Sequence, residues 1–395
     1  MSVSFAGRMA KVHRSFVTEI LGVTENPQII SFAGGIPNAD LFPVRELAEA
    51  ALKVLRESGR ATLQYSTTQG FPPLREWIAQ RYWTKHGMRV DPSEVLITNG
   101  SQQSFDLIGK LFLEPGDRVV MECPAYHGAL QGFSLYEPTF VQVPLLEDGI
   151  DVEALDRTLA QAPAKLFYTV PTFQNPSGLT YSREKRVRVA RLLAERGVLL
   201  VEDDPYSELR FEGEDLPPIK ALLGQEGIIL GTFSKTIAPG IRLGWSVAPR
   251  EITEKLVVAK QAADFHADML AQRTIYQYLA DNDLDAHIQL LREGYRKQRD
   301  FFLAAIVRHI PAEVRYTRPE GGMFVFMTLP HGLSSMELFE IAAQENVAFV
   351  PGRAFQTEGC GDDSLRLSFS SSTEEQMEEG MRRLGQAIRR LMSAK

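Results

Sequence analysis

The stretch Gly227-Ile228-Ile229-Leu230-Gly231-Thr232-Phe233-Ser234-Lys235 is a short apolar run followed by small and hydroxyl residues and one lysine. Such a run, followed by the turn residues Ala238-Pro239-Gly240, is typical of a strand that is buried on both faces. We therefore expect a strand that delivers Lys235 at its carboxyl end. The alternatives are a surface lysine on a loop, or a nucleotide P-loop, which the absence of a glycine directly before Lys235 contradicts.

Short β-rich runs alternate with helical patterns on both sides of this stretch. The alternation predicts an α/β fold with a large, mostly parallel seven-stranded sheet that is covered by helices. The expected strands are residues 94–98, 118–121, 140–144, 166–170, 198–201, 228–231 and 243–247. Expected helices between them include residues 102–113, 152–160 and 183–195.

The pattern changes after Arg250 and predicts a smaller α+β domain. Two long helices are expected first, at residues 251–280 and 284–309. The N-terminal segment, with a short helix and a turn at Gly34-Gly35, is expected to contact this domain. We divide the chain into an N-terminal arm with part of the small domain (1–45), a large domain (46–295) and a small C-terminal domain (296–395). Within the last, strands are expected at 314–317, 323–329, 347–350 and 365–368, and a final helix at 374–392.

Composition narrows the class of protein. A length of 395 residues allows two domains, and 44% hydrophobic with 24% charged residues is ordinary for a soluble globular chain. The net charge of −7 argues against general binding to nucleic acid or anionic membranes. Cys123 and Cys360 lack metal spacing and favour a reducing, cytoplasmic location, and the first residues lack the apolar segment of a signal peptide.

Other chemistries lack their motifs. The seven histidines have no metal-ligand spacing, so no metal is expected. Neither a Gly-x-Ser-x-Gly elbow nor a Gly-x-Gly-x-x-Gly fingerprint occurs.

Polar residues follow the expected strands, in the order Asn175, Asp203, Tyr206 and Lys235. The carboxyl ends of parallel strands meet at one sheet edge, where open α/β sheets bind ligands. This set matches pyridoxal 5'-phosphate (PLP). Lys235 could condense with its aldehyde as a Schiff base and act as a general base, and Asp203 could keep the pyridine nitrogen protonated. Asn175 and Tyr206 could donate to the phenolic oxygen and lower the Schiff-base pKa.

Each of these residues also has a plainer interpretation. Asp203 could cap a helix or face solvent, and Asn175-Pro176-Ser177-Gly178 is an ordinary turn signal. Tyr126 could stack on the cofactor ring or belong to the core. Arg366, inside an apolar strand-like run, could bind a substrate carboxylate or reach solvent from an edge strand.

A phosphate would need fixed donors. Asn99-Gly100-Ser101-Gln102 lies between a strand and a helix, so the helix N-terminus offers free backbone N–H groups. Ser101 could add its hydroxyl, although a serine at a helix N-cap needs no ligand to explain it. Thr232, Ser234 and Arg242 could supply the remaining donors, Arg242 as a bidentate clamp.

With these residues, the chain resembles the fold-type I PLP-dependent aminotransferases of class I/II over nearly its whole length. It is most similar to the subgroup that acts on 2-aminoadipate, kynurenine, aromatic and branched-chain amino acids. The segments that carry the resemblance are Ser31-Phe32-Ala33-Gly34-Gly35-Ile36-Pro37, Leu63-Gln64-Tyr65-Ser66, Gly100-Ser101-Gln102-Gln103, Gln174-Asn175-Pro176-Ser177-Gly178, Glu202-Asp203-Asp204-Pro205-Tyr206 and Gly321-Gly322-Met323-Phe324.

The resemblance implies the roles given above for Lys235, Asp203, Asn175 and Tyr206. It also implies a homodimer in which Tyr65 reaches the phosphate of the neighbouring subunit. For the phosphate it implies binding by Ser101, Gln102, Ser234 and Arg242, with Thr232 where many relatives have serine. For the cofactor ring it implies stacking by Tyr126. For the substrate it implies binding by Asn175, Arg366 and the backbone of Gly35.

One position departs from the family pattern. Aminoadipate-type relatives carry an arginine for the distal carboxylate in the N-terminal helix, where this chain has Thr18. Arg14, one turn earlier, is the candidate replacement. Without it, apolar or aromatic amino donors are favoured.

The sequence thus predicts a homodimeric aminotransferase that transfers an amino group from an L-2-amino acid to a 2-oxo acid such as 2-oxoglutarate by a ping-pong mechanism. Nucleic acid and membrane partners are not expected. One alternative is a PLP-dependent β-lyase or decarboxylase. Another is a non-catalytic ligand-sensing domain like those of certain transcription regulators, which carry an N-terminal DNA-binding domain, whereas here the aminotransferase pattern begins within the first 30 residues.

Overall fold

The structure is a computed structural model that describes residues 3–10, 12, 28–224, 227–357 and 362–394. Arg14, Thr18 and Cys360 lie outside the described residues, as does most of the segment in which the N-terminal helix is expected.

The main sheet confirms the predicted seven mostly parallel strands. Within the described residues its order is β2-β9-β8-β7-β6-β3-β4, and the two-residue β5 extends the edge beside β4. All seven run parallel except β9, which is antiparallel to both of its neighbours. Their bounds are β2 Val95–Thr98, β3 Arg118–Cys123, β4 Thr139–Leu146, β5 Gly149–Ile150, β6 Leu166–Thr169, β7 Leu199–Asp203, β8 Ile228–Thr232 and β9 Gly244–Val247.

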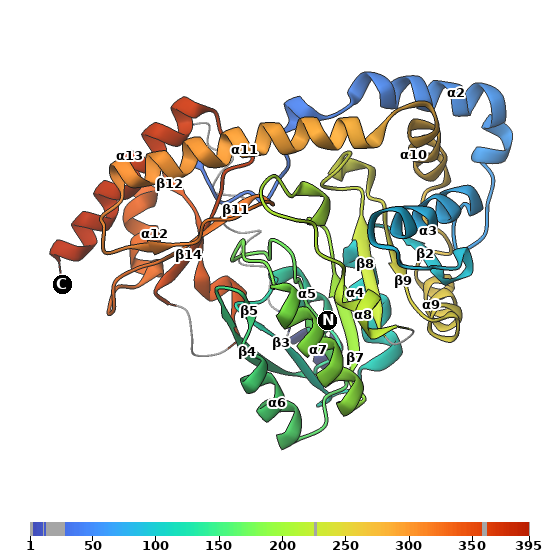
Figure 1. The fold of residues 1–395 in the computed structure, drawn as a ribbon, viewed down its shortest axis with the longest axis horizontal. Helices are drawn as coiled ribbons and strands as arrows, with labels where there is room; N and C mark the ends of the chain where they lie inside the picture. The colour runs from blue at the N-terminus through green and yellow to red at the C-terminus, as the bar shows by residue number, and fades with distance from the viewer. Residues whose placement is uncertain (1–2, 11, 13–27, 225–226, 358–361, 395) are drawn as a thin grey trace.

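Helices cover both faces of this sheet (Figure 1). Successive strand residues face opposite sides, so Phe167 belongs to the core under α6 and α7, whereas Tyr168 belongs to the core under α4 and α5. The helices of this part are α2 Val44–Thr62, α3 Pro72–His86, α4 Ser101–Phe112, α5 His127–Ser134, α6 Val152–Gln161, α7 Arg183–Arg196, α8 Ile219–Leu223, α9 Arg250–Ala263 and α10 Met269–Asp281.

The predicted single helix at 251–280 is wrong, because the chain forms α9 and α10 with a break between them. Phe265 adopts a left-handed φ of 67°, which no continuous helix allows. Asp264 accepts hydrogen bonds from Lys260 and from Asn99 of a distant loop. Asp268 then caps the start of α10. The position of the break is therefore determined by these side-chain contacts and not by the helix periodicity of the sequence.

The C-terminal part contains a four-stranded antiparallel sheet in the order β10-β11-β14-β13. The predicted strand at 347–350 is divided into β12, which pairs with the N-terminal β1, and β13, which joins the larger sheet. Elements here are β1 Ile30–Ser31, β10 Arg315–Tyr316, β11 Phe324–Thr328, β12 Val347–Ala348, β13 Val350–Pro351, β14 Ser364–Ser368, α11 Leu284–His309, α12 Ser335–Gln344 and α13 Glu374–Ser393.

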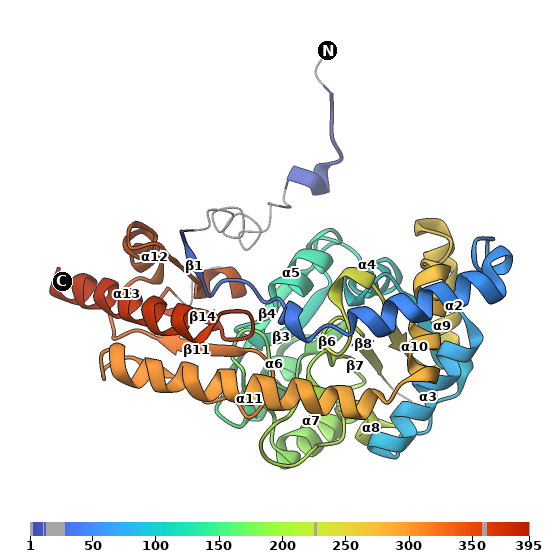
Figure 2. The same ribbon diagram turned by 90° about the horizontal axis from the view of Figure 1, so that it is seen from above.

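The N-terminal segment contacts the C-terminal part as expected, through the pairing of β1 with β12. The predicted turn at Gly34-Gly35 is wrong, because residues 32–38 form no turn and neither glycine has a left-handed φ. Helix α11 runs along both parts of the molecule, beside α13 at its C-terminal end (Figure 2). The predicted domain boundaries at 45 and 295 stay predictions.

Short 3-10 helices complete the described elements: η1 Gly7–Ala10, η2 Ala39–Leu41, η3 Pro92–Glu94, η4 Ser207–Leu209, η5 Pro239–Ile241 and η6 Gly352–Phe355. No helix in the described part of the chain is long and apolar enough to cross a bilayer. The same residues contain no group of three or more His, Cys, Asp or Glu side chains that could hold a metal ion.

Candidate active site

A cavity of about 350 Å³ lies where the carboxyl ends of β6, β7 and β8 meet the N-terminus of α4. Of the residues predicted from the sequence, all but Tyr65 line it. They are Gly35, Ser101, Gln102, Tyr126, Asn175, Asp203, Tyr206, Thr232, Ser234, Lys235, Arg242 and Arg366. Parallel strands place their carboxyl ends at one edge, which is why residues far apart in the sequence converge here.

Lys235 lies just after β8, with its amine inside the cavity. Its Nζ donates a hydrogen bond to the Gly35 carbonyl at 3.1 Å. Burial, together with the positive charges of Arg366 and Arg242, lowers the pKa of Lys235 to about 8. A substantial fraction of the amine is therefore uncharged near neutral pH, as a nucleophile or general base requires.

Asp203 ends β7 and is almost completely buried. Its Oδ2 accepts a hydrogen bond from the Tyr168 hydroxyl at 2.9 Å, whereas Oδ1 has no partner among the described residues. Burial raises the pKa of Asp203 to about 7. A buried oxygen without a donor is expected to meet one from a ligand. The neighbouring Asp204 instead accepts from the Ser207 hydroxyl at 2.6 Å.

Arg366 is a buried cation that forms no ion pair within the described residues. Only 1% of it is exposed, and burial lowers its pKa to about 10. Its Nη1 donates to Asn175 Oδ1 at 2.8 Å and its Nη2 to the Ala33 carbonyl at 2.6 Å, while Nε has no hydrogen-bond partner among the residues that the structure describes. The guanidinium also lies over the Phe324 ring, 4.6 Å from its centre. Since such a charge is costly alone, an anionic ligand is its expected partner.

Asn175, which accepts the hydrogen bond from Arg366, lines the same cavity as Tyr206. Tyr206 is buried, and burial raises its pKa well above its ordinary value. Tyr206 therefore stays a protonated hydroxyl and can donate. Tyr126 is partly buried, and burial raises its pKa to about 12.

The N-terminus of α4 and Arg242 form a cradle of donors at the other end of the cavity. Gly100 caps this helix with φ 72° and provides no side-chain hydrogen bond. A side chain at position 100 would begin 2.6 Å from Arg242 Nη2, so glycine is needed for the close approach. Ser234 lies beside Thr232, with their hydroxyls 2.8 Å apart. These groups suit a phosphate.

The predicted phosphate roles of Gln102 and Tyr65 stay predictions. Gln102 lines the cavity, but its amide donates to the Gly128 carbonyl at 3.0 Å. Tyr65 lies outside the cavity, is 80% exposed, and contacts the rings of Phe265 and His266 at 5.8 and 6.0 Å.

Sequence reasoning missed five residues that line the cavity: Ile36, His127, Val170, Pro205 and Pro239. His127 is the most informative, because burial lowers its pKa to about 3 and keeps it neutral. Adjacency to Gly35 and Tyr126 is the signal that could have identified Ile36 and His127.

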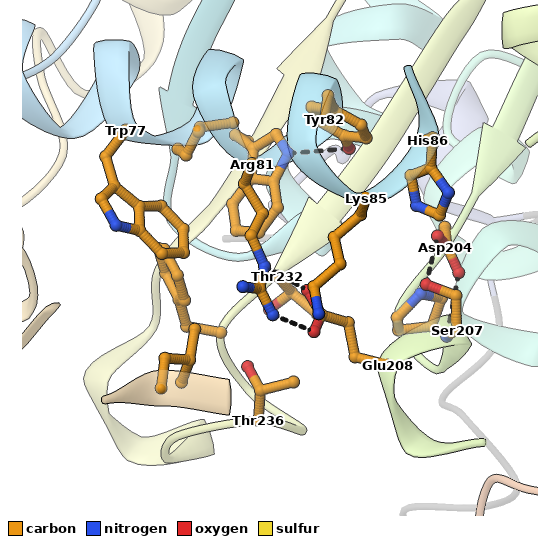
Figure 3. Close-up of a pocket in the computed structure, with 15 residues that line it drawn as sticks. Trp77, Arg81, Tyr82, Lys85, His86, Asp204, Ser207, Glu208, Thr232 and Thr236 are labelled. Atoms are coloured by element: carbon orange, nitrogen blue, oxygen red, sulfur yellow. Dashed lines mark hydrogen bonds and ion pairs between the residues drawn. The ribbon is translucent and has the colours of Figure 1, made fainter. Parts of the chain in front are cut away.

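A second cavity of about 50 Å³ shares Pro205 and Thr232 with the first (Figure 3). Two of its cations, Arg81 and Lys85, form ion pairs with acidic side chains: Glu208, which also lines the cavity, and Asp285, which does not. Arg81 donates to Glu208 at 2.9 Å and to Asp285 at 2.7 Å, and Lys85 lies 2.8 Å from Asp285.

Comparison with known proteins identifies the family. The family model "Aminotransferase class I and II" matches residues 27–384. The chain belongs to this family. A 2-aminoadipate transaminase from Thermus thermophilus is 44% identical, with 99% of this chain and 98% of that protein covered. Aromatic-amino-acid aminotransferase 1 from Thermococcus litoralis is 40% identical, with coverages of 98% and 94%.

Solved structures agree in fold and contain the cofactor. The α-aminoadipate aminotransferase from Thermus thermophilus, complexed with N-(5'-phosphopyridoxyl)-L-leucine, has a TM-score of 0.92 at 44% identity and covers 99% of this chain and 98% of its own. A kynurenine aminotransferase from Pyrococcus horikoshii, in complex with PMP, gives 0.94 at 40%, covering 98% and 97%. This aminotransferase is a PLP-dependent transaminase. The Lys235 amine, the donor cradle and the Asp203 oxygen that has no donor among the described residues fit that cofactor.

Proposed function

We propose that this aminotransferase transfers the amino group of an aromatic, branched-chain or 2-aminoadipate-type L-amino acid to a 2-oxo acid such as 2-oxoglutarate. The observation that carries the proposal is Arg366, a buried guanidinium that has no acidic partner among the described residues and lies in the same cavity as the Lys235 amine. The transaminases at 40–44% identity are named for aminoadipate and aromatic substrates, which supports the donor class and disfavours a β-lyase, decarboxylase or non-catalytic sensor.

The residues would hold the cofactor as follows. Asp203 Oδ1 would accept a hydrogen bond from the protonated ring nitrogen, and Asn175 and Tyr206 would hold the phenolic oxygen. The cradle of Gly100, Ser101, Ser234 and Arg242 would hold the phosphate, and Tyr126 would cover the ring. When bound, PLP supplies an aldehyde that takes up the amino group and a ring that accepts the electrons released at the substrate Cα.

The chain's own residues would then orient the substrate and move its proton. Arg366 and Asn175 would bind the α-carboxylate and direct the Cα–H bond toward Lys235. The Lys235 amine, released from the Gly35 carbonyl, would take the Cα proton, and its lowered pKa of about 8 suits that role. The backbone of Gly35 would line the substrate.

We further propose a cytoplasmic homodimer in which Tyr65 completes the phosphate site of the partner. Its 80% exposure and its place outside its own cavity support this role. Thr18 and Arg14 lie outside the described residues, so the amino acid panel below decides whether acidic side chains are accepted.

The test is spectroscopic. The purified protein, loaded with PLP, is titrated with single amino acids while its visible absorption band is followed. Conversion to the amine form of the cofactor by aromatic, branched-chain or 2-aminoadipate donors, with release of the matching 2-oxo acid, is the expected result. A band that no amino acid of the panel converts would overturn the proposal.

A further inference from the structure

The carboxylate of Glu122 is fully buried at the end of β3, and the chemistry described above does not use it. Its Oε1 accepts hydrogen bonds from the hydroxyls of Thr169 and Tyr181 at 2.6 and 2.7 Å. Oε2 accepts from Gln174 Nε2 at 3.0 Å, and the Val170 N–H reaches both oxygens at 3.2 and 3.3 Å. All four partners donate to the carboxylate, which favours its charged form, whereas burial raises the pKa of Glu122 to about 7.

These donors come from the beginning, middle and end of one loop. Thr169 ends β6 and Val170 follows it, Gln174 lies midway, and Tyr181 closes the loop before α7. Each is at most 1% exposed. A buried loop has no ladder of backbone hydrogen bonds, so side-chain partners must fix its path. Glu122 therefore holds residues 169–181 at three points.

Gln174 connects Glu122 to the active site. Its Nε2 donates to Glu122 and also to the Pro124 carbonyl at 2.7 Å, while its Oε1 accepts from the Ser177 N–H at 2.8 Å. Pro124 lies two residues before the cavity-lining Tyr126. The next residue after Gln174 is Asn175, which receives the hydrogen bond from Arg366.

We propose that Glu122 is a positioning residue that acts through Gln174 to hold Asn175 between Arg366 and Tyr206, and thereby sets the affinity for the substrate carboxylate. This inference rests on the proposed function of Asn175 and Arg366. Glu122 touches neither Arg366 nor Lys235 in any hydrogen bond of the described residues, so its effect is indirect.

The test replaces the carboxylate with an amide of nearly equal volume. In Glu122→Gln, one acceptor oxygen becomes an NH₂ group. Toward Gln174 Nε2 and the Val170 N–H this group meets donors that cannot accept, and toward Thr169 and Tyr181 it forces the hydroxyls to change from donors to acceptors, so the set of contacts that holds the loop is disrupted. The probe is 3-phenylpropionate, a carboxylate without an amino group, whose Kd is measured by titration of the PLP-loaded protein. We expect the Kd and the KM for the amino donor to rise about tenfold, with a smaller change in kcat.

A second variant, at Gln174, tests the hydrogen bond between Glu122 and Gln174 by itself. Because it leaves Glu122 unchanged, the inference can be tested even if Glu122→Gln does not fold. Gln174→Met leaves Glu122 and its three other donors in place but removes the hydrogen bond from the side chain of residue 174, next to Asn175, to Glu122. The same rise in Kd is expected. The pKa of the cofactor's visible band is also expected to rise, because Asn175 and Tyr206 would donate less well to the phenolic oxygen.

Glu202→Gln is the matched control. Glu202, on β7, is equally buried and pairs with Thr169 in the sheet, but within the described residues its carboxylate accepts only from groups outside residues 169–181, the backbone N–H groups of Ile219 and Lys220 at 2.9 and 2.8 Å. This variant is expected to lower the melting temperature and leave the Kd unchanged. If Glu122→Gln and Gln174→Met also change only the melting temperature, the inference is wrong.

Measurements on the wild-type protein distinguish a failure of the proposed function from a failure of the positioning role of Glu122. Failure of its band to convert with any amino acid contradicts the proposed function. Conversion by the wild type, with an unchanged Kd in both loop variants, contradicts the positioning role alone.

Discussion

The Lys235 cavity and the cavity of Figure 3 share Pro205 and Thr232, yet their charged groups are partnered differently. Around Lys235, Arg366 has no acidic partner and Asp203 Oδ1 has no donor among the described residues. In the other cavity, Arg81 bridges Glu208 and Asp285.

This difference shows how a ligand site can be told from a structural one. A buried charge without a partner is costly, and a protein keeps one where a ligand supplies the missing group. Paired charges satisfy one another and need no ligand. Substitutions in the first cavity should therefore alter catalysis and binding, and substitutions in the second should alter stability.

The largest effect is expected from Lys235→Ala. Turnover should fall by at least about 10³-fold, since a positioned base alone contributes about 10²–10⁴-fold. PLP should still bind through the cradle around Gly100 and Arg242. Steady-state rates and a cofactor titration measure the two properties, and retained turnover would exclude Lys235 as the essential amine.

Asp203→Asn comes next. The loaded variant should lose about 10²–10³-fold in kcat, because the amide cannot hold a proton on the ring nitrogen by charge. A kcat equal to that of the wild type would show that another group holds this proton.

The same variant has an opposite effect on the stability of the cofactor-free protein. Burial raises the pKa of Asp203 to about 7, so between about pH 4 and 7 the folded state holds a proton that the unfolded chain has lost. Stability of the wild type therefore falls as the pH rises through this window. Asp203→Asn should be more stable than the wild type at pH 8 by at least about 1 kcal/mol, with the difference vanishing near pH 4, as measured by denaturant unfolding.

Arg366→Gln should act on substrate affinity. Loss of a charged hydrogen bond to the α-carboxylate should raise the KM for the amino donor about 10–100-fold, with a smaller change in kcat. Initial rates over a range of donor concentrations measure this. An unchanged KM would place the carboxylate elsewhere.

Arg81→Met, in the paired cavity, should have the smallest catalytic effect. Removing this guanidinium deprives the carboxylates of Glu208 and Asp285 of their hydrogen bonds from Arg81. The loss should lower the free energy of unfolding by about 1.5–3 kcal/mol. The KM should equal that of the wild type. A higher KM would mean that the second cavity influences the first, which would weaken the comparison.

Much of the site could be predicted from the sequence because its chemistry depends on local signals. A lysine after an apolar run, an aspartate after another, and an asparagine in a Pro-Ser-Gly turn are each visible without a structure. The rule that parallel strands end at one edge then brings Lys235, Asp203 and Asn175 together.

Local patterns also determined most of the elements. The alternation of apolar runs and helical periods predicted the seven main strands, and the period over 284–309 gave the bounds of α11. Periodicity failed at residues 264–268, because Asp264 is held by Asn99, 165 positions away. Helix propensity depends only on residues that are close in the sequence, so it cannot predict a contact between such distant residues.

Tertiary structure alone decided which charges lack partners. The hydrogen bond between Arg366 and Asn175 joins residues 191 positions apart, and that between Gln174 and Glu122 joins residues 52 apart. The sequence supplied the residue types and the strand ends, since both follow from side-chain chemistry and periodicity. The burial of Arg366, the free oxygen of Asp203 and the satisfied carboxylate of Glu122 arise only when distant segments pack together, because packing removes water and fixes which donors each group can reach.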